Sequence, residues 1–224
     1  MATSMRAGFD RQLRTLQDDV LLMGSMVEKA IERSIDALVR LDHVLARRII
    51  EEDQDINDAR WRLEEDAVRL LATQQPMAGD LRLIASVIQI SAELERIGDH
   101  AEGIAKIVLM HGDQPPVKPL LDIPRMADLA RSMLRRSLDA LVRRDADAAR
   151  EIARDDDAVD ALYDQVYREL LVLMIADPHL IQRATWLLWA AHNVERMADR
   201  ATNVCERVGY VVTGKMVEID VSTY

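Results

Sequence analysis

The chain contains two copies of the same segment, and this duplication constrains its fold more than any other feature. Residues 33–42, RSIDALVRLD, return at residues 136–145 as RSLDALVRRD, with eight of the ten residues identical and an offset of 103 positions. Residues 95–101, ERIGDHA, return at residues 195–201 as ERMADRA, with an offset of 100 positions. Such self-similarity predicts two copies of one structural unit. Any site carried by these segments is then expected twice.

The spacing of apolar residues predicts long helices. Apolar side chains recur at alternating intervals of three and four residues, which places them on one face of a helix. One such seam consists of Leu13, Leu16, Val20, Met23, Val27 and Ala30, and another of Val87, Ile90, Leu94, Ile97, Ala101, Ile104 and Val108. With only 8 Gly and 6 Pro in 224 residues, architectures that need many turns are disfavoured.

The predicted fold is all-α, with helices over 10–41, 43–73, 78–110, 124–144, 146–176 and 178–213. Because short connections join antiparallel neighbours, these form two tandem three-helix bundles, six long antiparallel helices in all. Four of the six prolines, at positions 115, 116, 119 and 124, interrupt the helical pattern. We therefore divide the chain into a first three-helix repeat at 1–111, a proline-rich linker at 112–123, a second three-helix repeat at 124–213, and a C-terminal tail at 214–224 that is expected to be frayed.

Charge and cysteine content narrow the class of protein. The formal net charge is −10 and no basic patch is evident, so a nucleic acid is not an expected partner. The single cysteine, Cys205, cannot form an intramolecular disulfide and suits a reducing compartment. No secretory signal is visible, and the longest apolar run, at 170–176, is far shorter than the roughly 20 residues that cross a bilayer. We expect a cytoplasmic protein with no membrane span.

The repeated ERxxD segments place two carboxylates one helical turn apart in each copy. Glu95 lies four residues before Asp99, and Glu195 lies four residues before Asp199. The helical rotation adds Glu102 to this face in the first copy, and Asn203, Glu206 and His192 in the second. Of these, Glu102, Asn203 and His192 are additional candidate metal ligands.

A second set of acids begins the middle helix of each copy. Asp156 and Asp160 form another pair at i and i+4, whereas the corresponding pair in the first copy, Asp53 and Asn57, has one amide. If the middle and third helices pack antiparallel, two helices present four or more oxygens to one point. Such a cluster suits a hard cation such as Mg²⁺, Mn²⁺, Ca²⁺ or iron, because the ion cancels the repulsion between carboxylates. The alternative is a solvated face with ion pairs to Arg96, Arg196, Arg200 and Lys106.

Several catalytic patterns are absent from the sequence. It contains no Gly-rich phosphate loop, no GxSxG nucleophile motif, and no Glu followed three residues later by His, which ferritin-like di-iron bundles require. A non-catalytic regulator that binds protein partners is the leading hypothesis. A carboxylate-rich metal-dependent enzyme or iron-storage protein, and a helical adaptor with no ligand, are the alternatives.

Three segments resemble the PhoU-type phosphate-signalling regulators: QPMAGDLRLI at 75–84, ELERIGDHAEGIAK at 93–106 and VERMADRATNVCE at 194–206. The resemblance covers about residues 10–213. It implies two tandem three-helix bundles, a homodimer, and multinuclear metal clusters, commonly of iron or zinc, with manganese or magnesium as further options. The residues that it places toward metal are Glu95, Asp99, Glu195, Asp199, Asp156 and Asp160, with Asp53 as a weaker counterpart.

The same resemblance implies a negative regulator of the phosphate-starvation response. Such proteins couple the ATPase subunit of a phosphate ABC transporter to a membrane sensor histidine kinase, and so work at the inner face of the membrane without spanning it. Two departures from the repeat matter here: Asn57 replaces an acid, and Thr202 stands where the first copy has Glu102. We therefore expect the two copies to bind metal unequally.

Overall fold

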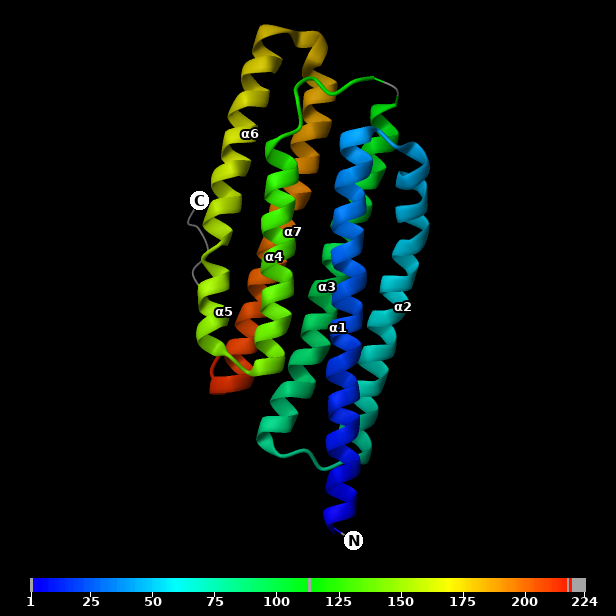
Figure 1. Ribbon diagram of the computed structural model, residues 1–224, viewed down its shortest axis with the longest axis vertical. Coiled ribbons are helices and arrows are strands. Elements are labelled where there is room, and N and C mark those ends of the chain that lie inside the picture. The colour runs from blue at the N-terminus through cyan, green and yellow to red at the C-terminus, as the bar shows by residue number, and fades with distance from the viewer. Residues whose placement is uncertain (1, 113, 217, 219–224) are drawn as a thin grey trace.

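The computed structural model describes residues 2–112, 114–216 and 218, and the regular secondary structure within them is entirely helical (Figure 1). The first repeat consists of α1 (Ala2–Arg40), α2 (His43–Thr73) and α3 (Ala78–His111). The second consists of α4 (Asp122–Arg143), α5 (Ala146–Ala153), α6 (Asp156–Ala176), a 3₁₀ turn η1 (Pro178–Leu180) and α7 (Ile181–Thr213). The all-α fold with two three-helix repeats is confirmed, with α5 and α6 together in the place of one predicted helix. The prediction for the tail falls mostly on residues outside the described part of the chain.

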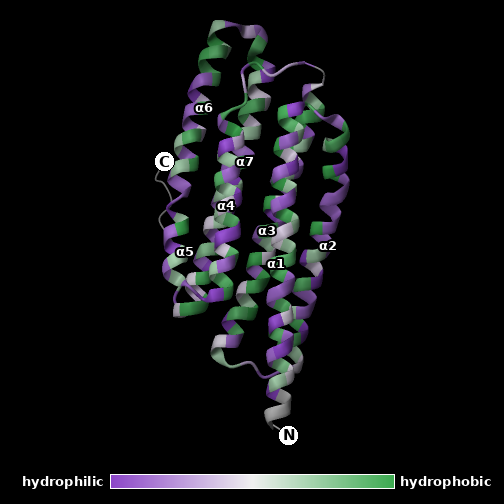
Figure 2. Cartoon of the chain, viewed as in Figure 1, coloured by the Kyte–Doolittle hydropathy of each residue, from purple (hydrophilic) through white to green (hydrophobic). Residues whose placement is uncertain are grey.

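The two bundles lie side by side and share one apolar core. The third helices of the two repeats, α3 and α7, pack against each other, and α1 packs against α4. The predicted seam of α3 is fully buried from Val87 to Val108, and the seam of α1 is buried except for the half-buried Ala30. Figure 2 shows the result as alternating apolar and polar faces along each helix. Burial of these seams is the main source of stability, at about 25 cal/mol per Å² of apolar surface.

Each repeat turns from its first to its second helix in the same way. The residues that end the first helices, Leu41 and Arg144, both have left-handed backbone angles, with φ of 52° and 54°. The next residues, Asp42 and Asp145, cap the following helices by accepting hydrogen bonds at 2.9 Å from the backbone N–H groups three residues on. A left-handed residue other than glycine costs about 1–2 kcal/mol, and the N-cap offsets a cost of this size.

The helix predicted over 146–176 is interrupted, which corrects the sequence analysis. At Arg154 and Asp155 the backbone tightens into i to i+3 hydrogen bonds, and α6 starts at Asp156. Three consecutive aspartates at 155–157 are poor residues for a helix interior but are stabilised in the first turn of a helix by its dipole. The break therefore makes Asp156 the first residue of α6. In the part of the chain that the structure describes, no helix combines the length and hydropathy needed to cross a membrane.

Candidate metal centres

The antiparallel packing of the middle and third helices brings the predicted acids together in each repeat. We call Asp53 of α2 with Glu95, Asp99 and Glu102 of α3 the first acidic cluster. We call Asp156 and Asp160 of α6 with Glu195 and Asp199 of α7 the second acidic cluster. The two sets occupy equivalent places, offset by 103 positions in the middle helix and by 100 in the third. In each repeat the fold thus brings together acids that are more than thirty positions apart in the sequence.

The acids of the first acidic cluster lie close enough for their charges to raise each other's pKa. Burial, followed by the charges of Glu102 and Asp99, raises the pKa of Asp53 to about 6. Burial and the charges of Glu95 and Glu102 likewise raise the pKa of Asp99. A close helix contact makes this approach possible, because a Cβ on Gly98 would lie 3.3 Å from Asp53 Oδ1.

Protein donors already neutralise much of the first acidic cluster. Arg60 donates from Nη1 to Glu95 Oε1 at 3.0 Å, and Lys106 Nζ lies 2.5 Å from Glu102 Oε2. Asn57 donates from its amide to Asp53 Oδ2 at 3.0 Å. Of the ion pairs that the alternative interpretation named, this cluster contains the one between Lys106 and Glu102.

The second acidic cluster is more deeply buried and less compensated. Asp156 is only 1% exposed, and neither of its carboxylate oxygens has a hydrogen-bond partner. Burial, followed by the charges of Asp160, Asp199 and Glu195, raises its pKa to about 7. Burial and the charge of Asp199 raise the pKa of Glu195 to about 7 as well. Burial also raises the pKa of Asp199, although Arg196 donates to Asp199 at 2.9 Å and opposes the shift.

The additional candidate ligands of the second repeat take two different positions. His192 Nδ1 lies 3.2 Å from Glu195 Oε2 without hydrogen-bond geometry, so this buried oxygen also has no hydrogen-bond partner. Asn203 turns to the other repeat and donates to Glu93 Oε2 at 3.1 Å. His192 thus borders the second acidic cluster, whereas Asn203 serves the contact between repeats.

The carboxylates are close but not yet arranged around an ion. Among the described residues, no three His, Cys, Asp or Glu side chains are grouped as a metal site would hold them. Their backbone positions are fixed by packed helices, so binding of an ion requires rotation of these side chains rather than movement of the helices. What the arrangement offers is buried anionic oxygen without a counter-charge, which is what a cation stabilises.

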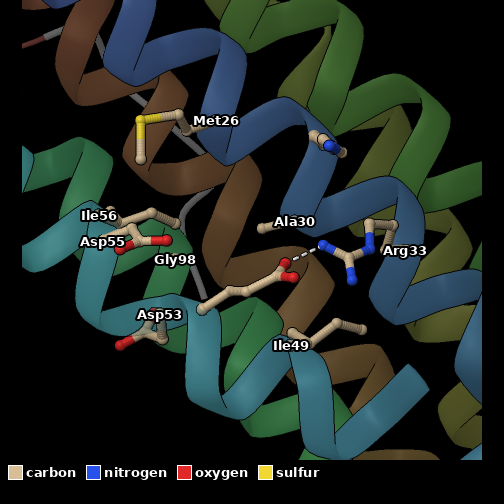
Figure 3. A pocket seen from close by; sticks show the side chains of 10 residues that line it. Met26, Ala30, Arg33, Ile49, Asp53, Asp55, Ile56 and Gly98 are labelled. Atoms are coloured by element: carbon tan, nitrogen blue, oxygen red, sulfur yellow. Dashed lines mark hydrogen bonds and ion pairs between the residues drawn. The ribbon is translucent and has the colours of Figure 1, made fainter. Parts of the chain in front are cut away.

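Sequence reasoning missed a pair of cross-helix ion pairs next to these clusters. Arg33 of α1 pairs with Glu52 of α2, and Arg136 of α4 pairs with Asp155 at the equivalent place. In the first repeat this ion pair borders a pocket of about 240 Å³ between α1, α2 and Gly98, and the Asp53 carboxylate points away from Arg33 (Figure 3). Both partners recur at an offset of 103, so a comparison of the two copies could have revealed this pair of ion pairs.

Comparison with known proteins identifies the family. The family model described as PhoU domain matches the chain twice, at residues 20–108 and 123–208. The chain belongs to the PhoU family. The two matches coincide with the two helical repeats, so each repeat is one PhoU domain.

Relatives named for phosphate transport match nearly the whole chain. A phosphate-specific transport system accessory protein PhoU homolog from Clostridium acetobutylicum is 39% identical over 213 residues, which are 95% of this chain and 97% of that protein. The phosphate-specific transport system accessory protein PhoU of Escherichia coli K12 is 36% identical over 92% of this chain and 86% of its own length. These PhoU proteins are named as accessory and regulatory proteins rather than as enzymes.

Two crystal structures have the same fold. PhoU from Pseudomonas aeruginosa superposes with a TM-score of 0.88 at 35% identity, covering 92% of this chain and all of that one. The phosphate transport system regulatory protein PhoU from Streptococcus pneumoniae also gives a TM-score of 0.88, at 33% identity and 94% coverage of this chain. The architecture is that of a PhoU protein.

Proposed function

We propose that this protein is a non-catalytic accessory regulator of phosphate uptake that represses the phosphate-starvation response when phosphate is plentiful. The observation that carries the proposal is the double PhoU domain, together with relatives of that name that the chain matches over almost their whole length. The alignment with the Clostridium acetobutylicum relative covers 97% of that protein, so the likeness is not confined to one part of it.

The proposed mode of action is that of a helical adaptor. It links the ATPase subunit of a phosphate ABC transporter to a membrane sensor histidine kinase at the inner face of the membrane, and it acts as a homodimer. A rigid pair of three-helix bundles suits this role, because long exposed helix faces can present two separate surfaces to two partners.

We further propose that metal ions form part of the regulator. The buried Asp156 carboxylate without a partner supports this, since an isolated buried charge is costly unless it is paired or bound to a cation. Asp156, Asp160, Glu195 and Asp199 would hold an ion in the second repeat, and Asp53, Glu95, Asp99 and Glu102 are the corresponding residues of the first. The ion would supply positive charge that fastens α6 to α7. Iron or zinc is favoured, and manganese or magnesium also fits oxygen ligands.

Deletion of the gene in its own host tests the regulatory role. We expect the deletion to activate a phosphate-starvation reporter in phosphate-rich medium, and the gene restored on a plasmid to silence it. A deletion strain with normal repression would reject negative regulation. Purified transporter ATPase subunit and the cytoplasmic part of the kinase, each tested for binding by calorimetry, would show whether the adaptor role is correct.

Metal content tests the second part of the proposal independently. Untagged protein purified without chelator should contain iron, zinc or manganese by inductively coupled plasma mass spectrometry. A folded protein that contains no metal, and takes up none on reconstitution, would leave a metal-free adaptor. Regulation and metal binding can therefore fail separately.

A further inference from the structure

The two acidic clusters differ in the residues that surround them, although they occupy equivalent places. Arg60, which pairs with Glu95 in the first repeat, is replaced by Tyr163 in the second. Asn57, which donates to Asp53, is replaced by the acid Asp160. Each replacement removes a donor or adds a negative charge.

The ion pair at the far end of the first acidic cluster also has no equivalent in the second. Lys106 pairs with Glu102 in the first repeat, and the equivalent residues of the second are Glu206 and Thr202. The first acidic cluster thus has two cations, Arg60 and Lys106, for its four acids. In the second acidic cluster Arg196 pairs with Asp199, and the charge of Arg200, which pairs with Glu93, also acts on Asp199.

The burial of the two clusters makes this difference important. Asp156 is 1% exposed and lacks a partner on both oxygens, whereas its equivalent Asp53 is half-buried and holds the amide of Asn57. The second acidic cluster therefore combines deeper burial with carboxylate oxygens that have no hydrogen-bond partner, and a bound cation relieves the cost of both.

We infer that the metal of this protein is a divalent transition ion bound by the second acidic cluster alone, and that Arg60, Asn57 and Lys106 replace the metal in the first. This inference rests on the metal binding proposed above and assigns it to one repeat. The inference specifies which repeat binds metal, where the sequence predicted only that the two repeats bind it unequally.

His192 favours a transition ion over Mg²⁺ or Ca²⁺. Its ring borders the cluster, with Nδ1 3.2 Å from Glu195 Oε2, and neutral imidazole is a ligand for zinc and iron rather than for the hard alkaline-earth ions. Tyr163 lies beside His192, with ring centroids 6.0 Å apart.

A matched pair of variants tests which repeat holds the ion. Asp156→Asn with Asp160→Asn removes two charges from the second acidic cluster, and Asp53→Asn with Asp99→Asn removes two from the first. Zn²⁺ titrations by calorimetry, with circular dichroism to verify folding, should show binding lost in the first variant and retained in the second. Loss in the Asp53 and Asp99 variant with retention in the other, or equal loss in both, would overturn the inference while metal binding itself stands. No Zn²⁺ binding and no bound metal in the parent protein would instead reject the proposed metal function.

A variant designed to gain metal binding tests the role of the protein's own donors in the first repeat. Misfolding could not produce the expected result, because a misfolded protein would not gain a specific site. Asn57→Asp, Arg60→Tyr and Lys106→Glu together give the first repeat the residues of the second. We expect the bound Zn²⁺ per chain to rise above that of the parent, and the reciprocal change, Asp160→Asn with Tyr163→Arg, to abolish binding. Unchanged Zn²⁺ content in the triple variant would show that the three donors do not exclude metal.

A comparison of Zn²⁺ and Mg²⁺ binding tests the class of metal. His192→Ala should weaken Zn²⁺ binding by roughly tenfold or more and leave Mg²⁺ binding unchanged. Equal effects on both ions, or tighter binding of Mg²⁺ than of Zn²⁺ to the parent protein, would contradict a transition-metal site.

Discussion

Asn203 of the second repeat donates a hydrogen bond to Glu93 Oε2 of the first at 3.1 Å, and Arg200 places Nη1 3.5 Å from the same oxygen. The position equivalent to Glu93 is Asn193, whose Oδ1 lies 3.0 Å from His100 Nδ1. The equivalent positions 93 and 193 thus each carry a polar contact between α3 and α7. Only the link through Glu93 is an ion pair.

Removal of the Glu93 carboxylate should destabilise the contact between repeats. Glu93→Ala removes the carboxylate that pairs with both Arg200 and Arg96, and Arg200 Nε is already buried without a partner. We expect the free energy of unfolding to fall by about 2–3 kcal/mol in urea titrations. Glu65→Ala is the control, because its pair with Arg69 is exposed and contributes less than about 0.5 kcal/mol. Equal effects of the two changes would show that Glu93 does not stabilise the interface.

A methyl group at position 98 should separate α2 from α3. A Cβ on Gly98 would lie 3.1 Å from Ile56 Cδ1 and 3.3 Å from Asp53 Oδ1, so Gly98→Ala forces both side chains to move. We expect a net loss of about 1–2 kcal/mol by urea denaturation, since overpacking exceeds the gain in helix propensity. Gly209→Ala in α7 meets nothing within 4 Å and should stabilise the protein by up to about 1 kcal/mol. A stabilised Gly98→Ala variant would mean that the helices separate without cost.

The metal-free protein should lose stability as pH rises from about 5.5 to 7.5. The pKa values of Asp156 and Glu195 are raised to about 7 and that of Asp53 to about 6, all above their values in the unfolded chain. The folded state therefore binds more protons than the unfolded state in this window, and stability falls as these acids ionise. We expect a decrease of about 2 kcal/mol in EDTA-treated protein, measured by urea unfolding at several pH values.

Two comparisons check the origin of this pH dependence. Asp156→Asn should flatten the decrease, because an amide does not titrate. A saturating transition ion should remove the part due to Asp156 and Glu195, because the ion stabilises their ionised carboxylates, and leave the smaller part due to Asp53. A metal-free protein that becomes more stable between pH 5.5 and 7.5 would contradict the raised pKa values.

Cys205 should be unreactive while the protein is folded. Its side chain is fully buried, and burial raises the pKa of the thiol to about 12, so almost no thiolate is present at pH 8. Iodoacetamide labelling, followed by mass spectrometry, should be at least about 100-fold slower in buffer than in 8 M urea. Comparable rates in the two solutions would require that α7 opens readily around this residue.

Much of the fold followed from local pattern. The apolar seam of α3, from Val87 to Val108, was predicted from its spacing and is completely buried. The break before Asp156 was not predicted, because the duplication favoured one continuous helix and the first repeat has one. Consecutive aspartates gave a local signal for it, but the equivalent stretch of α2 is also acidic and does not break.

Side-chain partners were predicted less well than positions. The sequence placed Asn203 with Glu195 and Asp199 by helical rotation, yet its amide reaches Glu93 of the other repeat. It likewise gave no indication that Arg60 pairs with Glu95, thirty-five positions away. Such pairs depend on how helices from distant segments are rotated against each other.

The sequence by itself determined the duplication, the helices and which residue types recur, because repetition and periodicity are local properties of the chain. It also placed acids at matching positions in both repeats. Only the tertiary structure decided that Asp156 is buried without a partner while Asp53 has Asn57 beside it and Glu95 has Arg60. The physical reason is that burial and charge compensation depend on which atoms of other helices come within a few ångströms of a carboxylate, and the packing of α6 on α7 and of α2 on α3 sets those distances.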